Sequence, residues 1–206
     1  MELELKRGGR TARVETLGGE LGSYRDERGL EYIWGGDPAY WPGRNPLLFP
    51  IVGMLKEGKI RFDGREYAME RHGFARRREF TPAARGEDWV RLELRESAET
   101  LALYPYPFRL AVEQRLTDTG FSTAVTVANP GEGPLPFCLG AHTGFRCPLE
   151  AGERFEDYEL VFPERESCPT LLLRDGLLDR PAALPCLEDT DTLPLDYRWF
   201  DALDTL

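Results

Sequence analysis

The sequence has little of what marks a membrane-spanning, exported or metal-binding protein. No apolar run approaches the roughly 20 residues that a membrane helix requires. Leucine alternates with charged residues over positions 2–6, which is not the pattern of a signal peptide. The cysteines include no C-x-x-C pair of the kind that binds zinc; they are Cys138, Cys147, Cys168 and Cys186. We therefore expect a cytoplasmic protein with no membrane partner, whose thiols are free and mostly buried.

Positive charge and histidine are also scarce. The 206 residues include 26 Lys and Arg against 36 Asp and Glu, a net charge of −10. This balance disfavours nucleic acid as a partner, because an acidic surface repels phosphate backbones. The P-loop, dinucleotide-binding and serine-hydrolase motifs are missing, which excludes those classes. Only two histidines occur, so any imidazole chemistry must use His72 or His142.

Apolar residues at alternate positions are abundant, and this period of two predicts β-strands. In residues 89–95, three apolar side chains share one face and three charged side chains the other. Residues 108–117 repeat the pattern, and a turn leads to a β-branched return strand at 121–128. Asp63-Gly64 supply the positive φ angles of a tight hairpin turn within 60–67. Further strands are expected near residues 2–6, 12–17, 20–25, 30–34, 47–52, 135–139, 157–162 and 170–173.

The chain contains no clear amphipathic helix, internal repeat or linker between two compositions. With 41% hydrophobic and 30% charged residues, its composition is that of a folded globular protein. These features predict an all-β fold, a large antiparallel sandwich or barrel-like form, in one domain over residues 1–206.

Both histidines occur in unusual settings. His72 begins HGFAR at residues 72–76, and His142 lies within LGAHTGF at 139–145. Glycine next to each lets a ligand approach the backbone, and the neighbouring aromatic offers a ring face. The alternative is a pair of structural histidines that are hydrogen-bonded within the fold. A metal site is disfavoured, because no spacing identifies the further ligands that two distant histidines would need.

Several segments, taken in order, resemble the aldose 1-epimerase (galactose mutarotase) family, and within it the LacX-like branch. The first is NPLLFPIVG at residues 45–53, and HGFAR at 72–76 follows. PFCLGAHTGF at residues 136–145 continues the match, and DTL at 204–206 resembles a late D-[AT]-L strand of that branch. The resemblance covers essentially the whole chain, and linked motifs in the same order make it more specific than any one of them.

The resemblance implies a large, antiparallel, twisted β-sandwich of the galactose mutarotase type, which holds a small sugar in an open cleft without a cofactor. Mutarotation removes a proton from the anomeric hydroxyl and delivers one to the ring oxygen, so that the ring opens, the carbonyl turns and the ring recloses. Histidine suits these transfers because it titrates near neutral pH.

Site residues follow from the resemblance, motif by motif. His142 corresponds to the general acid toward the ring oxygen, and His72 to the histidine that binds sugar hydroxyls and supports the charge shift. Asp204, on the late strand, corresponds to a carboxylate that binds hydroxyls. Aromatic side chains are expected to stack on the apolar face of the sugar; they are Phe74, Trp41 and Phe145.

Two positions depart from the family pattern. Met54 stands where the family usually has an arginine that contacts the sugar, and Arg44, nearby in sequence, is our candidate for that contact. The general base of the family is a glutamate in a segment that would lie beyond Leu206. We therefore expect the chain to lack the C-terminal strands of the fold and to be a weak catalyst alone. Carboxylates inside the chain match no motif and are expected to be loop charges; they are Glu150, Glu153 and Glu156.

Two other functions stay open at this stage. One is a non-catalytic carbohydrate-binding or regulatory protein on the same scaffold. The other is a sugar-phosphate 1-epimerase, which would recruit Arg44 or Arg76 to the phosphate. The sequence does not identify the aldose, and it does not fix the oligomeric state.

Overall fold

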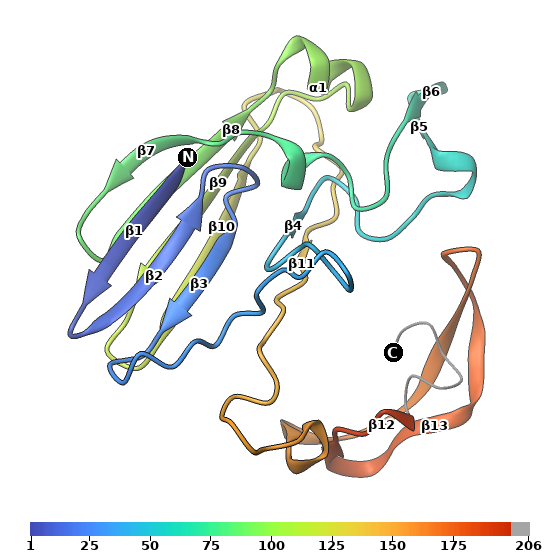
Figure 1. Ribbon diagram of the computed structural model, residues 1–206. Helices are drawn as coiled ribbons and strands as arrows, with labels where there is room; N and C mark the ends of the chain where they lie inside the picture. Colours follow the sequence, from blue (N-terminus) through green and yellow to red (C-terminus); the bar gives the residue numbers. More distant parts are fainter. Residues whose placement is uncertain (199–206) are drawn as a thin grey trace. The chain divides into compact units, whose positions relative to one another are not determined.

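The computed structural model describes residues 1–198, and the side chains of these except 168–172 and 179–186. It divides into two compact units, Met1–Arg146 and Cys147–Leu206, which we describe separately. In the first unit, a three-stranded and a four-stranded antiparallel sheet pack face to face (Figure 1). The three-stranded sheet has the order β1-β2-β3, with β1 (Glu2–Arg7), β2 (Arg10–Glu15) and β3 (Leu21–Arg25). The second has the order β10-β9-β8-β7, with β7 (Thr81–Arg85), β8 (Trp89–Arg95), β9 (Arg109–Leu116) and β10 (Phe121–Ala128).

Alternation along the strands places the core where the sequence predicted it. In β8, Val90, Leu92 and Leu94 are buried, while the residues between them are partly exposed. Apolar side chains of the facing sheet, such as Leu5 and Val14, belong to the same continuous core. Burial of these side chains is the main force that holds the two sheets together.

The predicted hairpin around Asp63-Gly64 is confirmed. It joins β5 (Lys59–Phe62) to β6 (Arg65–Ala68), and the two turn residues have φ angles of 48° and 79°. Positive φ at both central positions is the type I′ geometry that matches the twist of paired strands. Short 3₁₀ helices, η1 (Lys56–Gly58) and η2 (Ala75–Arg77), lie on either side of this hairpin in the sequence.

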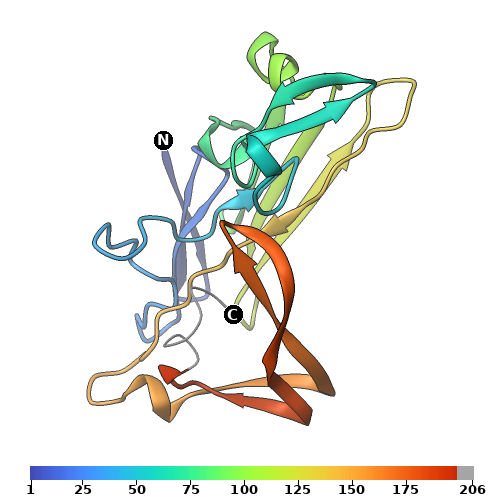
Figure 2. The ribbon, with the colours of Figure 1, turned by 90° about the vertical axis from the view of Figure 1, so that its right-hand side faces the viewer.

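One helix was not predicted. Helix α1 (Ala98–Leu103) contains six residues and begins with a capping box between Ser97 and Thr100. A helix this short completes fewer than two turns, so it shows no amphipathic period. Its capping box uses threonine where the usual pattern has Glu or Gln, which hid the start signal. Figure 2 shows α1 beside the β5–β6 hairpin, and α1 contacts β6.

Three of the expected strands are short or missing. Residues 30–34 form only isolated bridges, at Glu31 and Ile33. Only β4 (Leu47–Leu48) forms within 47–52, and its partner β11 (Gly140–Ala141) lies just after the expected 135–139 strand. Proline limits β4 because it cannot donate to a ladder: Pro46 directly precedes the strand, and Pro50 follows it after one residue.

The second unit is dominated by a long two-stranded hairpin. Strands β12 (Glu159–Arg174) and β13 (Leu177–Pro194) pair antiparallel after the short 3₁₀ helix η3 (Phe155–Asp157). The hairpin turns at Asp175 and Gly176, whose φ angles are 53° and 76°. No helix among residues 1–198 is long and apolar enough to cross a membrane.

The described thiols are free but not buried as expected. Cys138 is exposed and Cys147 is half-buried, and neither forms a disulfide. Cys138 precedes the short strand β11, where few neighbouring side chains cover it. The side chains of Cys168 and Cys186 lie outside the described residues.

Candidate active site

Residues 44–53, which we call the central segment, join the two histidine-bearing parts of the first unit. On one side, β4 pairs with β11, and the Cys138 N–H donates to the Pro50 carbonyl at 2.9 Å. On the other side, Phe49 forms a parallel bridge with Gly73. The Phe49 carbonyl also accepts the N–H groups of the two residues that follow Gly73, at 3.0 and 3.2 Å. A single stretch of backbone therefore holds both histidine motifs.

This arrangement brings together two residues that are 70 positions apart. The ring centroids of His72 and His142 are separated by 4.9 Å, and the ring planes are nearly perpendicular, at 88°. The segment that carries His142 is bonded to one edge of the central segment, and the segment that carries His72 is bonded to the other edge. A small polar ligand at this pair would meet two imidazoles at once.

His72 is fixed by the backbone of the central segment. Its N–H donates to the Gly53 carbonyl at 2.8 Å, and its Nδ1 accepts the Gly53 N–H at 3.1 Å. Because Nδ1 accepts a hydrogen bond, the proton of the neutral ring lies on Nε2. Burial, with added repulsion from His142, Arg76 and Arg71, lowers the pKa of His72 to about 4. At neutral pH, His72 is thus an uncharged donor through Nε2.

The lowered pKa of His72 predicts a specific loss of stability in mild acid. The ordinary pKa of histidine is near 6.5, so as pH falls from 6.5 toward 4 the unfolded chain takes up a proton at His72 and the folded chain does not. The free energy of unfolding should fall over this window by at most about 3 kcal/mol from this residue. Denaturant unfolding of the wild type and of His72→Asn, from pH 7 to 4, measures the difference. An equal decline in both proteins would contradict the assignment.

His142 differs from His72 in that its side chain is exposed and its backbone carries the anchoring bonds. Its N–H donates to the Pro46 carbonyl at 3.2 Å. The neighbouring Thr143 hydroxyl donates to Oδ1 of Asn45 at 2.7 Å, and the Gly144 N–H donates to the Arg44 carbonyl at 2.7 Å. The imidazole is therefore accessible while the chain that carries it is held.

Arg44 packs against a turn, whereas Trp41 and Phe145 lie next to or within the His142 segment. Arg44 is half-buried, and a Cβ built at Gly36 would lie 3.1 Å from Cζ of its guanidinium, so the side chain packs against that turn. Trp41 lies against Gly144, where a Cβ would be 2.8 Å from its ring. Trp41 and Phe145 are 37% and 64% exposed, which leaves ring surface for a ligand next to the His142 segment.

Phe74 lies in the core rather than at the surface. Its side chain is only 5% exposed, and its ring packs in the core against Phe49, Tyr104 and Phe108. The HGF sequence suggested a ring beside the ligand, but the residue after Gly73 turns inward. Asp204 lies outside the described residues, so its role stays a prediction.

Sequence reasoning missed two residues that organise this site. Gly53 bonds both the backbone and the ring of His72, and Asn45 bonds Thr143 beside His142. Both lie in the NPLLFPIVG motif, which was valued only as a marker of resemblance. Met54, at the position of the usual family arginine, directly follows Gly53 and is 38% exposed.

The carboxylates that were weighed as bases belong to the second unit. Glu153 accepts hydrogen bonds from the Tyr158 hydroxyl and, at 3.0 Å, from the Glu150 N–H. These are local loop contacts, in agreement with the loop role expected from the sequence.

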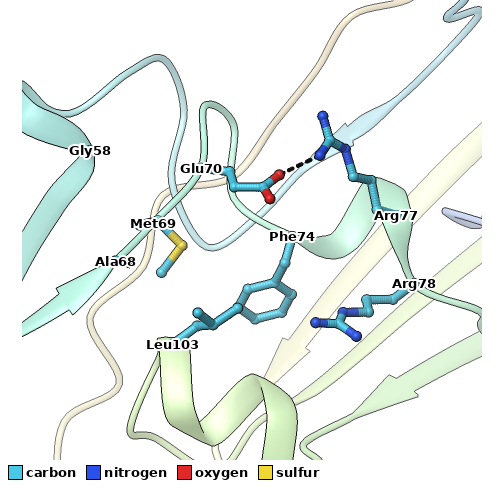
Figure 3. Close-up of a pocket in the computed structure, with 8 residues that line it drawn as sticks. All are labelled: Gly58, Ala68, Met69, Glu70, Phe74, Arg77, Arg78 and Leu103. Atoms are coloured by element: carbon cyan, nitrogen blue, oxygen red, sulfur yellow. Dashed lines mark hydrogen bonds and ion pairs between the residues drawn. The ribbon is translucent and has the colours of Figure 1, made fainter.

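A cavity of about 310 Å³ also lies in the first unit (Figure 3), and neither histidine is among the residues that line it. Its floor is apolar, with Met69, Phe74 and Leu103. Its two arginines are already paired: Arg77 with Glu70 at 2.6 Å, and Arg78 with Glu99. The cavity offers a sugar little hydrogen-bonding capacity, whereas the histidine pair offers two polar rings.

The sequence matches the family model described as aldose 1-epimerase over residues 1–179. Protein LacX (plasmid) of Lactococcus lactis subsp. lactis is 41% identical over 208 residues, which covers 97% of this chain and 70% of LacX. The chromosomal form of LacX is 40% identical over the same coverage.

Solved structures of related proteins are also similar. A galactose mutarotase related enzyme from Lactobacillus acidophilus superposes with a TM-score of 0.88 at 27% identity, covering 98% of this chain and 67% of that one. A galactose mutarotase-like protein from Lactobacillus casei gives 0.83 at 30% identity, covering 96% and 68%. These likenesses confirm the predicted fold class, which is antiparallel, mostly β and galactose mutarotase-like.

Proposed function

Because the chain belongs to the aldose 1-epimerase family, we propose that it is an isomerase that interconverts the α and β anomers of a free aldohexose by acid–base ring opening. The observation that carries the proposal is the pair of imidazole rings 4.9 Å apart on the two sides of the central segment. The family acts on small sugars, which supports an aldose as the ligand of this pair.

In this proposal, the two histidines have different tasks. His142 is exposed and delivers a proton to the ring oxygen as the C1–O5 bond breaks, while the anomeric hydroxyl loses its proton to solvent water and becomes the carbonyl of the open aldehyde. His72 is buried and neutral at pH 7, so its Nε2–H is a hydrogen-bond donor. It donates to a sugar hydroxyl and so stabilises the negative charge that develops on the anomeric oxygen. A neutral His72 also avoids repelling a protonated His142. Trp41 and Phe145 offer ring surface for the apolar face of the sugar.

Polarimetry tests this function directly. The 206-residue chain, added to freshly dissolved α-glucose or α-galactose, should bring the optical rotation to equilibrium faster than buffer alone. We expect the acceleration to be smaller than that of an enzyme with a complete acid–base pair, because we assign no general base within these 206 residues and such a group contributes about 10²–10⁴-fold. Sugar binding without acceleration would favour a non-catalytic carbohydrate-binding protein. A protein that neither binds the sugar nor accelerates its mutarotation would contradict the proposal.

A second candidate, a sugar-phosphate 1-epimerase, is supported by Arg76. Its Nε is buried and has no hydrogen-bond partner among residues 1–198, while its Nη2 donates to the Arg71 carbonyl at 3.0 Å. Arg76 is near enough to His72 to lower the pKa of that ring. A phosphate there would accept a hydrogen bond from the unpartnered Nε–H.

The same assay separates the two candidates. With glucose 6-phosphate in place of glucose, the phosphate candidate predicts a lower KM, and Arg76→Lys should remove that preference because lysine lacks the guanidinium fork. Equal KM values for the two sugars would leave the free aldohexose as the substrate.

A further inference from the structure

The carboxylate of Glu20 is bonded to the start of the central segment. Glu20 lies in the turn between β2 and β3, where its carbonyl accepts the Glu15 N–H at 2.8 Å. Its Oε1 accepts two backbone N–H groups, that of Arg44 at 2.7 Å and that of Asn45 at 2.5 Å. One half-buried carboxylate oxygen thus accepts the N–H groups of two consecutive residues, 24 and 25 positions further along the chain. Charge-assisted bonds of this kind are stronger than neutral ones.

The same two residues hold the His142 segment. The Arg44 carbonyl accepts from the Gly144 N–H, and the Asn45 side chain, 7% exposed, accepts from the Thr143 hydroxyl. Arg44 and Asn45, whose N–H groups bind Glu20, therefore each also accept a hydrogen bond from one of the two residues that follow His142.

These bonds matter because the regular ladder is short at this point. Strands β4 and β11, labelled in Figure 1, share two residue pairs, and His142 follows directly after the second. Past that pair, the His142 N–H bond to Pro46 is 3.2 Å long, and the two bonds at Arg44 and Asn45 are 2.7 Å each. The position of the exposed imidazole depends on how well this backbone is fixed.

We propose that Glu20 is a positioning residue of the active site, which fixes the His142 backbone through Arg44 and Asn45. The kinetic part of this inference rests on the proposed function, whereas the positional part does not. Within residues 1–198, no hydrogen bond or ion pair joins Glu20 to either imidazole ring, and its carboxylate acts through Arg44 and Asn45.

Two variants and a matched control test the proposal. Glu20→Ala removes the acceptor, and Glu20→Gln keeps an Oε1 acceptor without the charge. Asp26→Ala is the control, because Asp26 also accepts two backbone N–H groups in a turn, from Arg28 and Leu30 at 3.0 and 2.9 Å. The readout is the pair of imidazole ¹H–¹⁵N NMR signals, which needs no activity, together with kcat and KM for mutarotation.

In Glu20→Ala we expect the His142 signals to shift and kcat to fall about 10- to 10²-fold, with a smaller change in KM, since small misplacements of a catalytic group have effects of this size. Glu20→Gln should restore most of both, and Asp26→Ala should change neither. If Glu20→Ala does not fold, Thr143→Val, which removes the hydroxyl bonded to Asn45, should still shift the His142 signals. Wild-type His142 signals in Glu20→Ala, or in Thr143→Val where Glu20→Ala does not fold, would overturn the proposal, and so would an equal shift in Asp26→Ala. Shifted signals in a protein with no mutarotation would instead reject only the proposed function.

Discussion

Replacing His142 by asparagine should slow protein-dependent mutarotation by a factor of about 10²–10⁴, or to the uncatalysed rate if that is reached first. Asparagine keeps the backbone N–H that donates to the Pro46 carbonyl, and it keeps a polar side chain at an exposed position. It removes the group that transfers a proton to the ring oxygen. Polarimetry gives the rate, and sugar binding measured separately should be weakened much less than the rate.

Cys138→Ser is the matched control for this variant. Cys138 is exposed and lies near β11 as His142 does, but its thiol has no part in the proposed chemistry. It should leave the rate unchanged. An undiminished rate in His142→Asn would remove this residue from the mechanism.

Gly73→Ala should have the largest effect on stability of any single change at the site. Gly73 has φ of +69°, and a Cβ there would lie 2.2 Å from the carbonyl oxygen of Phe49, which is backbone and has no way to swing aside. The left-handed conformation and the forced shift together should lower the free energy of unfolding by about 2–5 kcal/mol. Displacement of Gly73 would also separate His72 from Gly53, so mutarotation should fall with it.

Gly64→Ala isolates the conformational part of this cost. Gly64 has φ of +79°, but a Cβ there would meet nothing within 4 Å. Denaturant unfolding should therefore show a loss of only about 1–2 kcal/mol, and the rate of mutarotation should be unaffected. Equal losses in the two variants would show that the approach of Gly73 to Phe49 is not as close as described.

Local patterns explain which parts of the fold were predictable. The β8 and β9 strands and the Asp63-Gly64 turn follow from alternation and from the φ angles that the turn requires, which are properties of neighbouring residues. Strand β7 was missed because its five residues are all exposed and show no alternation. Helix α1 was missed because it is too short to show a helical period.

The candidate site likewise has features that neighbouring residues predict and features that only contacts between distant segments determine. The presence of glycine beside each histidine suggested close approach of a ligand, but at Gly73 the close neighbour is the Phe49 carbonyl of the chain itself. The inward position of Phe74 and the bonds from Gly53 and Glu20 depend on contacts between distant segments, which composition and spacing do not encode. The family resemblance singled out His72 and His142, and the structure places their rings 4.9 Å apart and shows how the central segment joins them.

The most direct test of this account is a titration of the protein with an aldohexose, followed by the ¹H–¹⁵N NMR signals of its two imidazoles. Both rings report independently, since one is buried and bonded to Gly53 and the other is exposed. The account predicts that His72 and His142 shift together along one saturation curve, and that His142→Asn leaves the His72 shift in place. Saturable sugar binding that moves neither signal would contradict a sugar site at the histidine pair.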